Sequence, residues 1–260
     1  MIRSLTERSS CCFIRLASRA SQGKEGKEMF FWDPTYMLFM LPGFALVMIA
    51  QLWVSSTYRR WSQVRSSYGL SGSDAAQRLL GAGGLSDVSL GMTRGQLTDH
   101  YDPRSRTLQL SAGVAQSASV ASIAIAAHEI GHAMQDKEGY ATMRFRAALV
   151  PAANVSSILG WILILIGLFL QMTQIAWLGV LVFSGGALFA LATLPVELNA
   201  SARARVLLTN SGMIYNEDER RGVNAVLNAA AFTYVAALAT AILQLLYFVS
   251  MVGGMGRRRR

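Results

Sequence analysis

VSSILGWILILIGLFLQMTQIAWLGVLVFSGGALFALATL, residues 155–194, contains no charged side chain. Two apolar blocks, 155–170 and 175–194, flank the short uncharged segment 171–174. A helix that crosses a membrane needs about 20 consecutive apolar residues. The stretch therefore predicts a helical hairpin made of two transmembrane helices.

Two further apolar segments, 36–54 and 229–252, lie on either side of this hairpin. Aromatic residues stand at the edges of the first one, as is usual for side chains at a membrane interface. We expect a mainly α, integral membrane protein with about four transmembrane helices. Residues 1–29 are predicted to be an unstructured basic extension, and 253–260 a basic tail.

Residues 55–148 are polar enough to form a small α+β domain between the first and second transmembrane helices. Short apolar segments at 86–90 and 107–110 predict strands, and 98–103 has the composition of a turn. Ser117 or Ser119 could cap a helix that runs to Gln135. A second helix and a polar loop are expected over 195–228.

The charged residues are few and clustered. They make up 15% of the chain, hydrophobic residues make up 52%, and the formal net charge is +9. The Lys and Arg residues flank the apolar segments, which is typical of a protein in contact with a lipid bilayer. Because no nucleic-acid motif accompanies this charge, we expect no nucleic-acid partner.

His128-Glu129-Ile130-Gly131-His132 is an H-E-x-x-H sequence within a predicted helix. Residues four apart lie one turn apart on the same face, so both imidazoles can bind one zinc ion. Glu129 can then act as the general base towards a water on the metal. Both cysteines lie at 11 and 12, before the first apolar segment, so no thiolate is expected at this site.

Glu197 is the one charged residue between Arg146 and Arg203. A carboxylate at the end of a membrane-spanning segment is costly unless it is paired, hydrated or bound to metal. With four transmembrane helices, the segment that starts with Glu197 lies on the same side of the membrane as His128 and His132. Glu197 is therefore the predicted third zinc ligand, and the fourth position stays open.

Four segments carry a resemblance to the YugP-type family of membrane zinc metallopeptidases. They are 97–103 (LTDHYDP), 126–135 (AAHEIGHAMQ), 194–201 (LPVELNAS) and 227–235 (LNAAAFTYV). Glu197 with Ala200 and Ser201 is also similar to the E-x-x-A-D segment of gluzincin proteases. This chain has Ser201 where those have Asp, so the carboxylate that orients a ligand imidazole there must come from elsewhere.

The resemblance implies a zinc-dependent endopeptidase (EC 3.4.24.-) with one zinc ion per chain, a zincin-like domain and a polypeptide substrate that is membrane-associated or misfolded. Zincins often place a strand that pairs with extended substrate before the metal helix, and by that analogy 107–110 is an edge strand. We expect a multi-pass protein of the cell membrane with its catalytic side towards the cytoplasm.

Two residues have more than one interpretation. His100 could replace Glu197 as third ligand, donate to the oxyanion of the transition state, or only shape a turn before Pro103. Tyr234 could stabilise the same oxyanion or help helices to pack. Two other functions stay open, a catalytically silent membrane scaffold with a structural metal and an ion or proton transporter that uses Glu197.

Overall fold

The computed structural model describes residues 34–257, nearly all of which belong to one unit, Leu38–Arg260. The predicted basic extension 1–29 lies outside the described residues, as does most of the arginine run at the end of the chain. The described part is mainly helical and contains one small sheet.

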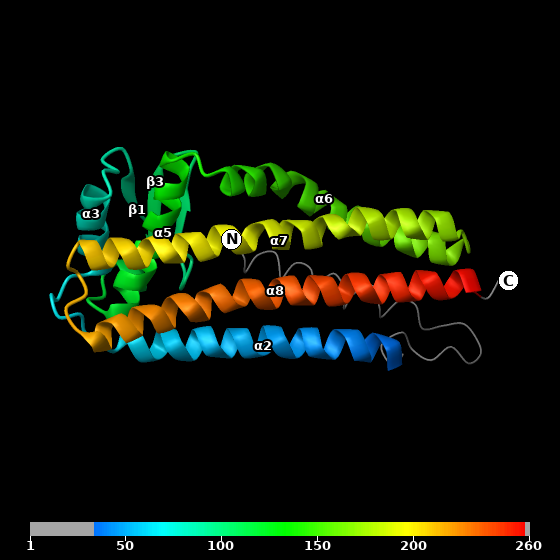
Figure 1. Cartoon of the computed structure of the whole chain (residues 1–260), viewed down its shortest axis with the longest axis horizontal. Helices are drawn as coiled ribbons and strands as arrows, with labels where there is room; N and C mark the ends of the chain where they lie inside the picture. Colours follow the sequence, from blue (N-terminus) through cyan, green and yellow to red (C-terminus); the bar gives the residue numbers. More distant parts are fainter. Residues whose placement is uncertain (1–33, 258–260) are drawn as a thin grey trace. The chain divides into compact units, whose positions relative to one another are not determined.

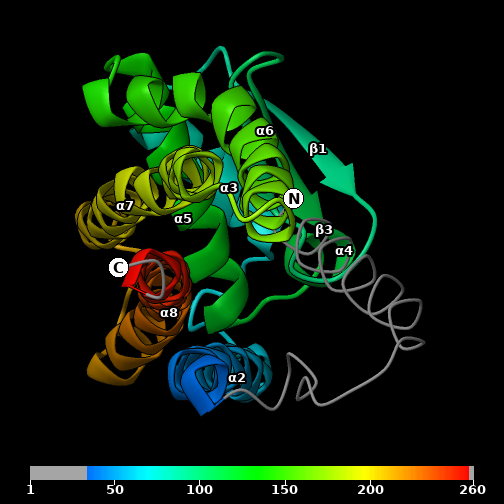
Figure 2. The ribbon, with the colours of Figure 1, turned by 90° about the vertical axis from the view of Figure 1, so that its right-hand side faces the viewer.

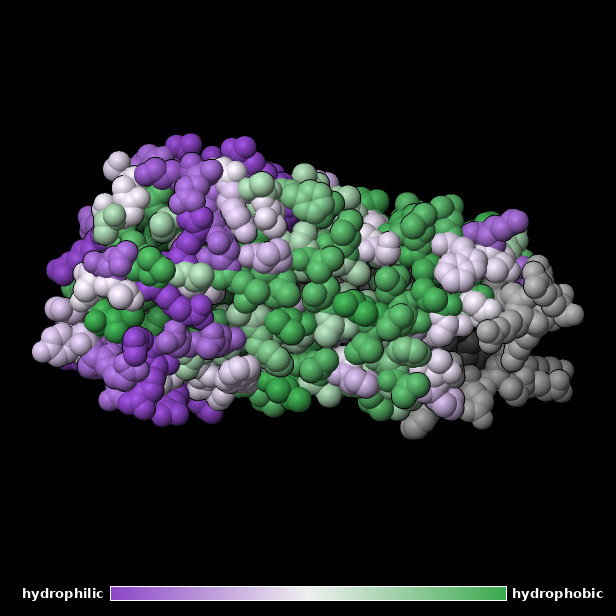
Figure 3. Space-filling view, viewed as in Figure 1, coloured by the Kyte–Doolittle hydropathy of each residue, from purple (hydrophilic) through white to green (hydrophobic). Residues whose placement is uncertain are grey.

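Within residues 34–257, four helices are long and apolar enough to cross a membrane, which confirms the predicted number. They run side by side (Figure 1), and an apolar surface covers the middle of their length (Figure 3). The polar surface gathers at the end where the sheet lies. The helices are α2 (Pro34–Ser62), α6 (Ala141–Phe169), α7 (Thr173–Asn210) and α8 (Glu217–Arg257).

Three of these helices extend well beyond the apolar segments that predicted them. α6 begins before its apolar block, and α7 continues through Pro195 to Asn210. Hydropathy detects only the part that can face lipid, whereas backbone hydrogen bonding continues the helix into the polar end. This extension places Glu197 inside helix α7, in agreement with the helix expected after residue 194.

Glycine allows the two helices of the hairpin to approach closely. A Cβ atom at Gly160 would lie 2.7 Å from the backbone of Phe183, and one at Gly167 would lie 2.4 Å from the amide nitrogen of Ala176. Small residues are typical of such close contacts between membrane helices. The hairpin therefore holds α7, which carries Glu197, firmly against α6.

The sheet has the order β1-β3-β2, with β1 (Ser89–Thr93) parallel and β2 (His100–Asp102) antiparallel to β3 (Thr107–Ser111). Two predictions are wrong here. The predicted turn 98–103 contains strand β2, and the predicted edge strand 107–110 is the central strand. Leu108 and Leu110 are fully buried, which suits a strand with neighbours on both sides.

The remaining helices pack around this sheet. α3 (Gly72–Ala82) is capped by Ser71, whose side chain and that of Asp74 form a capping box. The short α4 (Ala112–Ala115) leads into α5 (Val120–Lys137), the H-E-x-x-H helix, which Ser119 caps through the amide of Ser122. α5 lies between the sheet and the polar ends of α7 and α8 (Figure 2).

Gly131 sets the distance between α5 and α7. A Cβ atom there would lie 2.5 Å from the carbonyl oxygen of Ala200. We expect Gly131→Ala to lower the free energy of unfolding by about 1–3 kcal/mol, because overpacking outweighs the better helix propensity of alanine. Thermal or denaturant unfolding in detergent measures this change.

Gly81→Ala is the matched control, because a Cβ atom at this α3 position meets nothing within 4 Å. It is expected to leave stability unchanged or slightly higher. If both variants had the same free energy of unfolding, α5 and α7 would be able to move apart without loss of stability.

Candidate metal centre

Helix α5 presents His128 and His132 from successive turns. Their rings meet edge to face with centroids 4.9 Å apart, and both are largely buried. Ala124, Ala126 and Ala127 precede them and are fully buried, so this part of α5 has room for close neighbours. The helix therefore fixes both imidazoles on one face, next to α7.

Glu197 comes from α7 and meets both rings. Its Oε2 atom lies 3.3 Å from Nε2 of His128 and 3.3 Å from Nε2 of His132, and its side chain is only 2% exposed. Among the described residues, these three form a group whose ligand atoms all lie within 4.8 Å of one another.

The spacing of these atoms fits a zinc ion. Ligand atoms bound tetrahedrally to zinc at about 2.0–2.1 Å lie about 3.3–3.4 Å from one another. The two separations of 3.3 Å between Glu197 and the imidazoles match that value. Two nitrogens and one oxygen are also donors that zinc accepts, and they leave a fourth position for another ligand.

Gln135 fixes the orientation of His132. Its amide nitrogen donates to the carbonyl oxygen of Val196 at 2.8 Å and to Oδ1 of Asn199 at 2.9 Å. The amide oxygen of Gln135 is therefore left to accept from Nδ1 of His132, at 3.0 Å. His132 must carry its proton on Nδ1, which leaves the lone pair of Nε2 free for a metal.

Ser201 fixes the orientation of His128 in a similar way. Its hydroxyl lies 3.2 Å from Nδ1 of that ring and is buried against α5. Ser201 thus occupies the place where a carboxylate orients the imidazole in the gluzincin pattern, and a hydroxyl makes the contact instead. Although this chain has Ser201 where the gluzincin pattern has Asp, the His128 ring still has a hydrogen-bond partner.

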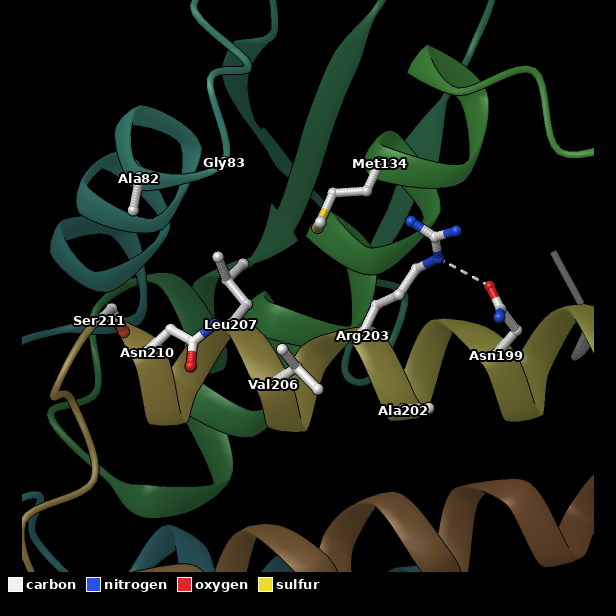
Figure 4. Close-up of a pocket in the computed structure, with 10 residues that line it drawn as sticks. All are labelled: Ala82, Gly83, Met134, Asn199, Ala202, Arg203, Val206, Leu207, Asn210 and Ser211. Carbon is white, nitrogen blue, oxygen red and sulfur yellow. Dashed lines mark hydrogen bonds between the residues drawn. The ribbon is translucent and has the colours of Figure 1, made fainter.

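The hydrogen-bonded chain continues beyond the ligands towards the surface. Nε of Arg203 donates to Oδ1 of Asn199 at 2.7 Å (Figure 4), and its two terminal nitrogens bind the Glu138 carboxylate. Arg203 and Asn199 line a groove of about 600 Å³ between α7, α5 and the end of α3. The orientation of His132 is therefore linked to this surface through Gln135 and Asn199.

Arg146 at the start of α6 neutralises Glu197. Its Nη1 atom lies 3.0 Å from Oε1, the carboxylate oxygen that the imidazoles do not contact. The two oxygens of Glu197 thus have separate partners, and Oε2 alone is directed at the imidazole nitrogens. A buried carboxylate needs such a partner to stay charged.

Glu129 stands beside the ligands without joining them. Its Oε2 atom accepts a hydrogen bond from the amide of Tyr101 at 3.0 Å. Burial raises the pKa of Glu129, and the nearby His132 and His128 oppose that rise. A raised pKa brings a carboxylate closer to the range in which it can both take and release a proton at neutral pH.

Comparison with known proteins identifies the family of this chain. Residues 36–253 match the family described as "Putative neutral zinc metallopeptidase". The chain belongs to this zinc metallopeptidase family. A relative named "Putative membrane protease YugP", from Bacillus subtilis (strain 168), is 40% identical over 214 residues, which cover 82% of this chain and 95% of that protein. No solved structure matches the chain significantly.

The two secondary candidate residues, His100 and Tyr234, lie in different places. Tyr234 on α8 is partly buried and contacts Glu197 through its hydroxyl. His100 is exposed, and its Nδ1 atom contacts the carbonyl oxygen of Thr98 at 2.8 Å. The structure therefore brings Tyr234 to the candidate metal centre, whereas His100 is not among the clustered ligand atoms.

The sequence did not point to Gln135, Arg146 or Tyr101. Gln135 follows His132 by three residues and could have been placed on the same face of α5 from its spacing alone. Arg146 and Tyr101 reach the site from α6 and β2, and only the tertiary arrangement brings them there.

Gln135→Ala is expected to weaken zinc binding about 10- to 100-fold, the usual cost of losing a partner that orients a metal ligand. His132 would then be free to place its proton on either nitrogen. Competition with a chromophoric zinc chelator measures the change. Gln116→Ala, at the exposed end of α4, serves as control and should bind zinc like the wild type. Wild-type affinity in the Gln135 variant would contradict this role.

Proposed function

We propose that this chain is a membrane-embedded, zinc-dependent endopeptidase that binds one zinc ion through His128, His132 and Glu197. The convergence of these three side chains from α5 and α7, with Glu129 next to them, is the observation that carries the proposal. The family match and the protease relative support the same chemistry.

Zinc bound at this site would act as a Lewis acid that lowers the pKa of a water molecule and polarises the scissile carbonyl. Glu129 takes the proton from the attacking water and delivers it to the leaving nitrogen. The amide of Tyr101 holds one oxygen of Glu129, so the other oxygen is available for this transfer. Tyr234, whose hydroxyl contacts Glu197, would stabilise the negative charge that develops on the carbonyl oxygen.

The position of the site supports a substrate at the membrane. Glu197 directly follows the apolar part of α7, and its neighbour Tyr234 belongs to the apolar part of α8. Trp53 of α2 packs on Phe232 of α8 near the same level, as expected for an aromatic belt at an interface. We infer that membrane-associated or misfolded polypeptides are the substrates, in the cell membrane and on its cytoplasmic side.

The test of this function is proteolysis by the purified protein in detergent or liposomes. Casein and a membrane-protein substrate should be cleaved, a zinc chelator should stop cleavage, and stoichiometric zinc should restore it. Bound zinc without any chelator-sensitive cleavage would favour a catalytically silent scaffold. Ion transport that survives His128→Ala would favour a transporter.

Orientation is tested separately by labelling a cysteine in intact cells. Ser211 lies at the end of α7 on the same side as the proposed site. In a background in which the two native cysteines are replaced by serine, Ser211→Cys should resist a membrane-impermeant thiol reagent until the cells are opened. Labelling in intact cells would place the site outside the cytoplasm.

A further inference from the structure

Tyr101 on β2 makes two hydrogen bonds to helix α5. Its backbone amide donates to Oε2 of Glu129 at 3.0 Å, and its hydroxyl donates to Oδ2 of Asp136 at 2.9 Å. Positions 129 and 136 are two turns apart and lie on the same face of the helix. One residue therefore joins the strand to α5 at both its backbone and the tip of its side chain.

Strand β2 lies at the edge of the sheet. Tyr101 is opposite Leu108 of the central strand in the antiparallel register, and its amide points away from that strand, to Glu129. A third contact fixes the segment just before β2, where the Asp99 carboxylate accepts hydrogen bonds from the amide and hydroxyl of Ser111. The strand is therefore held at three points around the site.

We propose that Tyr101 is a positioning residue, whose hydroxyl bond to Asp136 sets the place of the strand amide that orients Glu129 for catalysis. This inference rests on the proposed function. The hydrogen bond from the Tyr101 hydroxyl to Asp136 fixes the position of β2 along the axis of α5. The backbone amide of Tyr101 then donates to one carboxylate oxygen of Glu129. The second oxygen is left to exchange protons.

The proposed reaction requires that the Glu129 carboxylate be held in one orientation. A glutamate side chain has three rotatable bonds, so holding it in one rotamer costs conformational entropy. A displacement of about 1 Å at a catalytic group can reduce turnover about 100-fold. Neither ligand imidazole contacts Glu129 by a hydrogen bond among the described residues, so the amide of Tyr101 is the group that orients this carboxylate.

The test removes the hydrogen bond between the Tyr101 hydroxyl and Asp136 by changing either the donor or the acceptor. Tyr101→Phe and Asp136→Ala should each lower kcat about tenfold, with KM and zinc affinity unchanged, and the double variant should lose no more than one single variant. Asp136→Asn keeps an acceptor oxygen and should restore kcat. Tyr68→Phe, at an exposed ring outside the site, is the matched control. Wild-type kcat in Tyr101→Phe, or additive losses in the double variant, would overturn the proposal.

Hydrogen exchange provides a measurement that does not depend on activity. In protein labelled with [15N]tyrosine, the amides of Tyr101 and Tyr215 both donate to carboxylates, Glu129 and Glu219 respectively. Glu129→Ala should speed exchange at Tyr101 and leave Tyr215 unchanged, and Tyr101→Phe, followed with [15N]phenylalanine, should also exchange faster. An unchanged rate at position 101 in both variants would overturn the positioning role.

The two measurements separate this inference from the proposed function. If the wild type cleaves no substrate, the endopeptidase assignment fails, and the exchange rates still decide whether Tyr101 and Asp136 hold Glu129. If the wild type is active and Glu129→Gln is not, the kinetics of the Tyr101 and Asp136 variants decide the positioning role directly.

Discussion

Glu129→Gln is expected to reduce peptide hydrolysis about 10²- to 10⁴-fold, the usual contribution of a general base, while the protein keeps its full zinc content. The amide of glutamine has the same shape as the carboxylate and can still accept from the Tyr101 amide through its oxygen. It cannot take a proton at neutral pH. Zinc content by mass spectrometry and casein cleavage by the same purified sample measure the two effects.

Glu217→Gln is the control for this substitution. Glu217 lies at the start of α8, where its exposed carboxylate pairs with Arg220. It should keep both zinc and activity, because its charge does not reach the reacting groups. Turnover near the wild-type rate in the Glu129 variant would show that Glu129 is not the general base. Loss of zinc from this variant would show that Glu129 is a metal ligand.

Glu197→Ala is expected to lose the metal itself. The substitution removes one of three proposed ligands and leaves the guanidinium of Arg146 without its carboxylate. The variant should also be less stable before any metal is added, by less than the about 3–5 kcal/mol of a fully buried pair, because the remaining Arg146 side chain is 30% exposed. Zinc should raise the unfolding temperature of the wild type, because a ligand that binds only the folded state stabilises it. It should not raise that of the variant.

Thermal unfolding with and without zinc is the measurement, and Glu217→Ala is the control. Glu217 is an exposed acid at the start of α8, paired with Arg220 on the surface. Its removal should leave the response to zinc intact, because exposed pairs contribute little. A zinc-dependent shift of wild-type size in the Glu197 variant would show that α7 supplies no ligand.

The four transmembrane helices could be predicted because their signal is local. Residues 155–194 are apolar enough to identify the hairpin without knowledge of the rest of the chain, and the number of helices then placed Glu197 on the side of the H-E-x-x-H sequence. The start of α6 could not be predicted, because this helix begins among polar residues that hydropathy assigns to the domain before it. The continuation of α7 through Glu197 agrees with the helix expected after residue 194.

The proposed ligands were also accessible from the sequence. His128 and His132 are four apart on one helix, and Glu197 is conspicuous as a charge after an apolar segment. Arg146 and the amide of Tyr101 were not accessible. Arg146 looks like one more basic residue beside a membrane segment, and a backbone donor carries no signal in its side chain, so both depend on how α6 and β2 pack against α5 and α7.

The strands were the least predictable part. His100–Asp102 is a three-residue strand within a segment rich in turn-forming residues, and its pairing with β3 and α5 outweighs local propensity. This misassignment hid the contact between β2 and Glu129. The edge position of 107–110 was expected from the analogy with zincins, but its two leucines are buried between neighbouring elements.

X-ray absorption at the zinc edge, on the full-length protein in detergent, tests most directly whether His128, His132 and Glu197 share one ion. The expected spectrum shows two imidazole ligands and oxygen ligands at about 2.0–2.2 Å, with no sulfur. His132→Ala should remove one imidazole or the whole signal. A spectrum with sulfur ligands, or one unchanged by that substitution, would contradict the proposed centre.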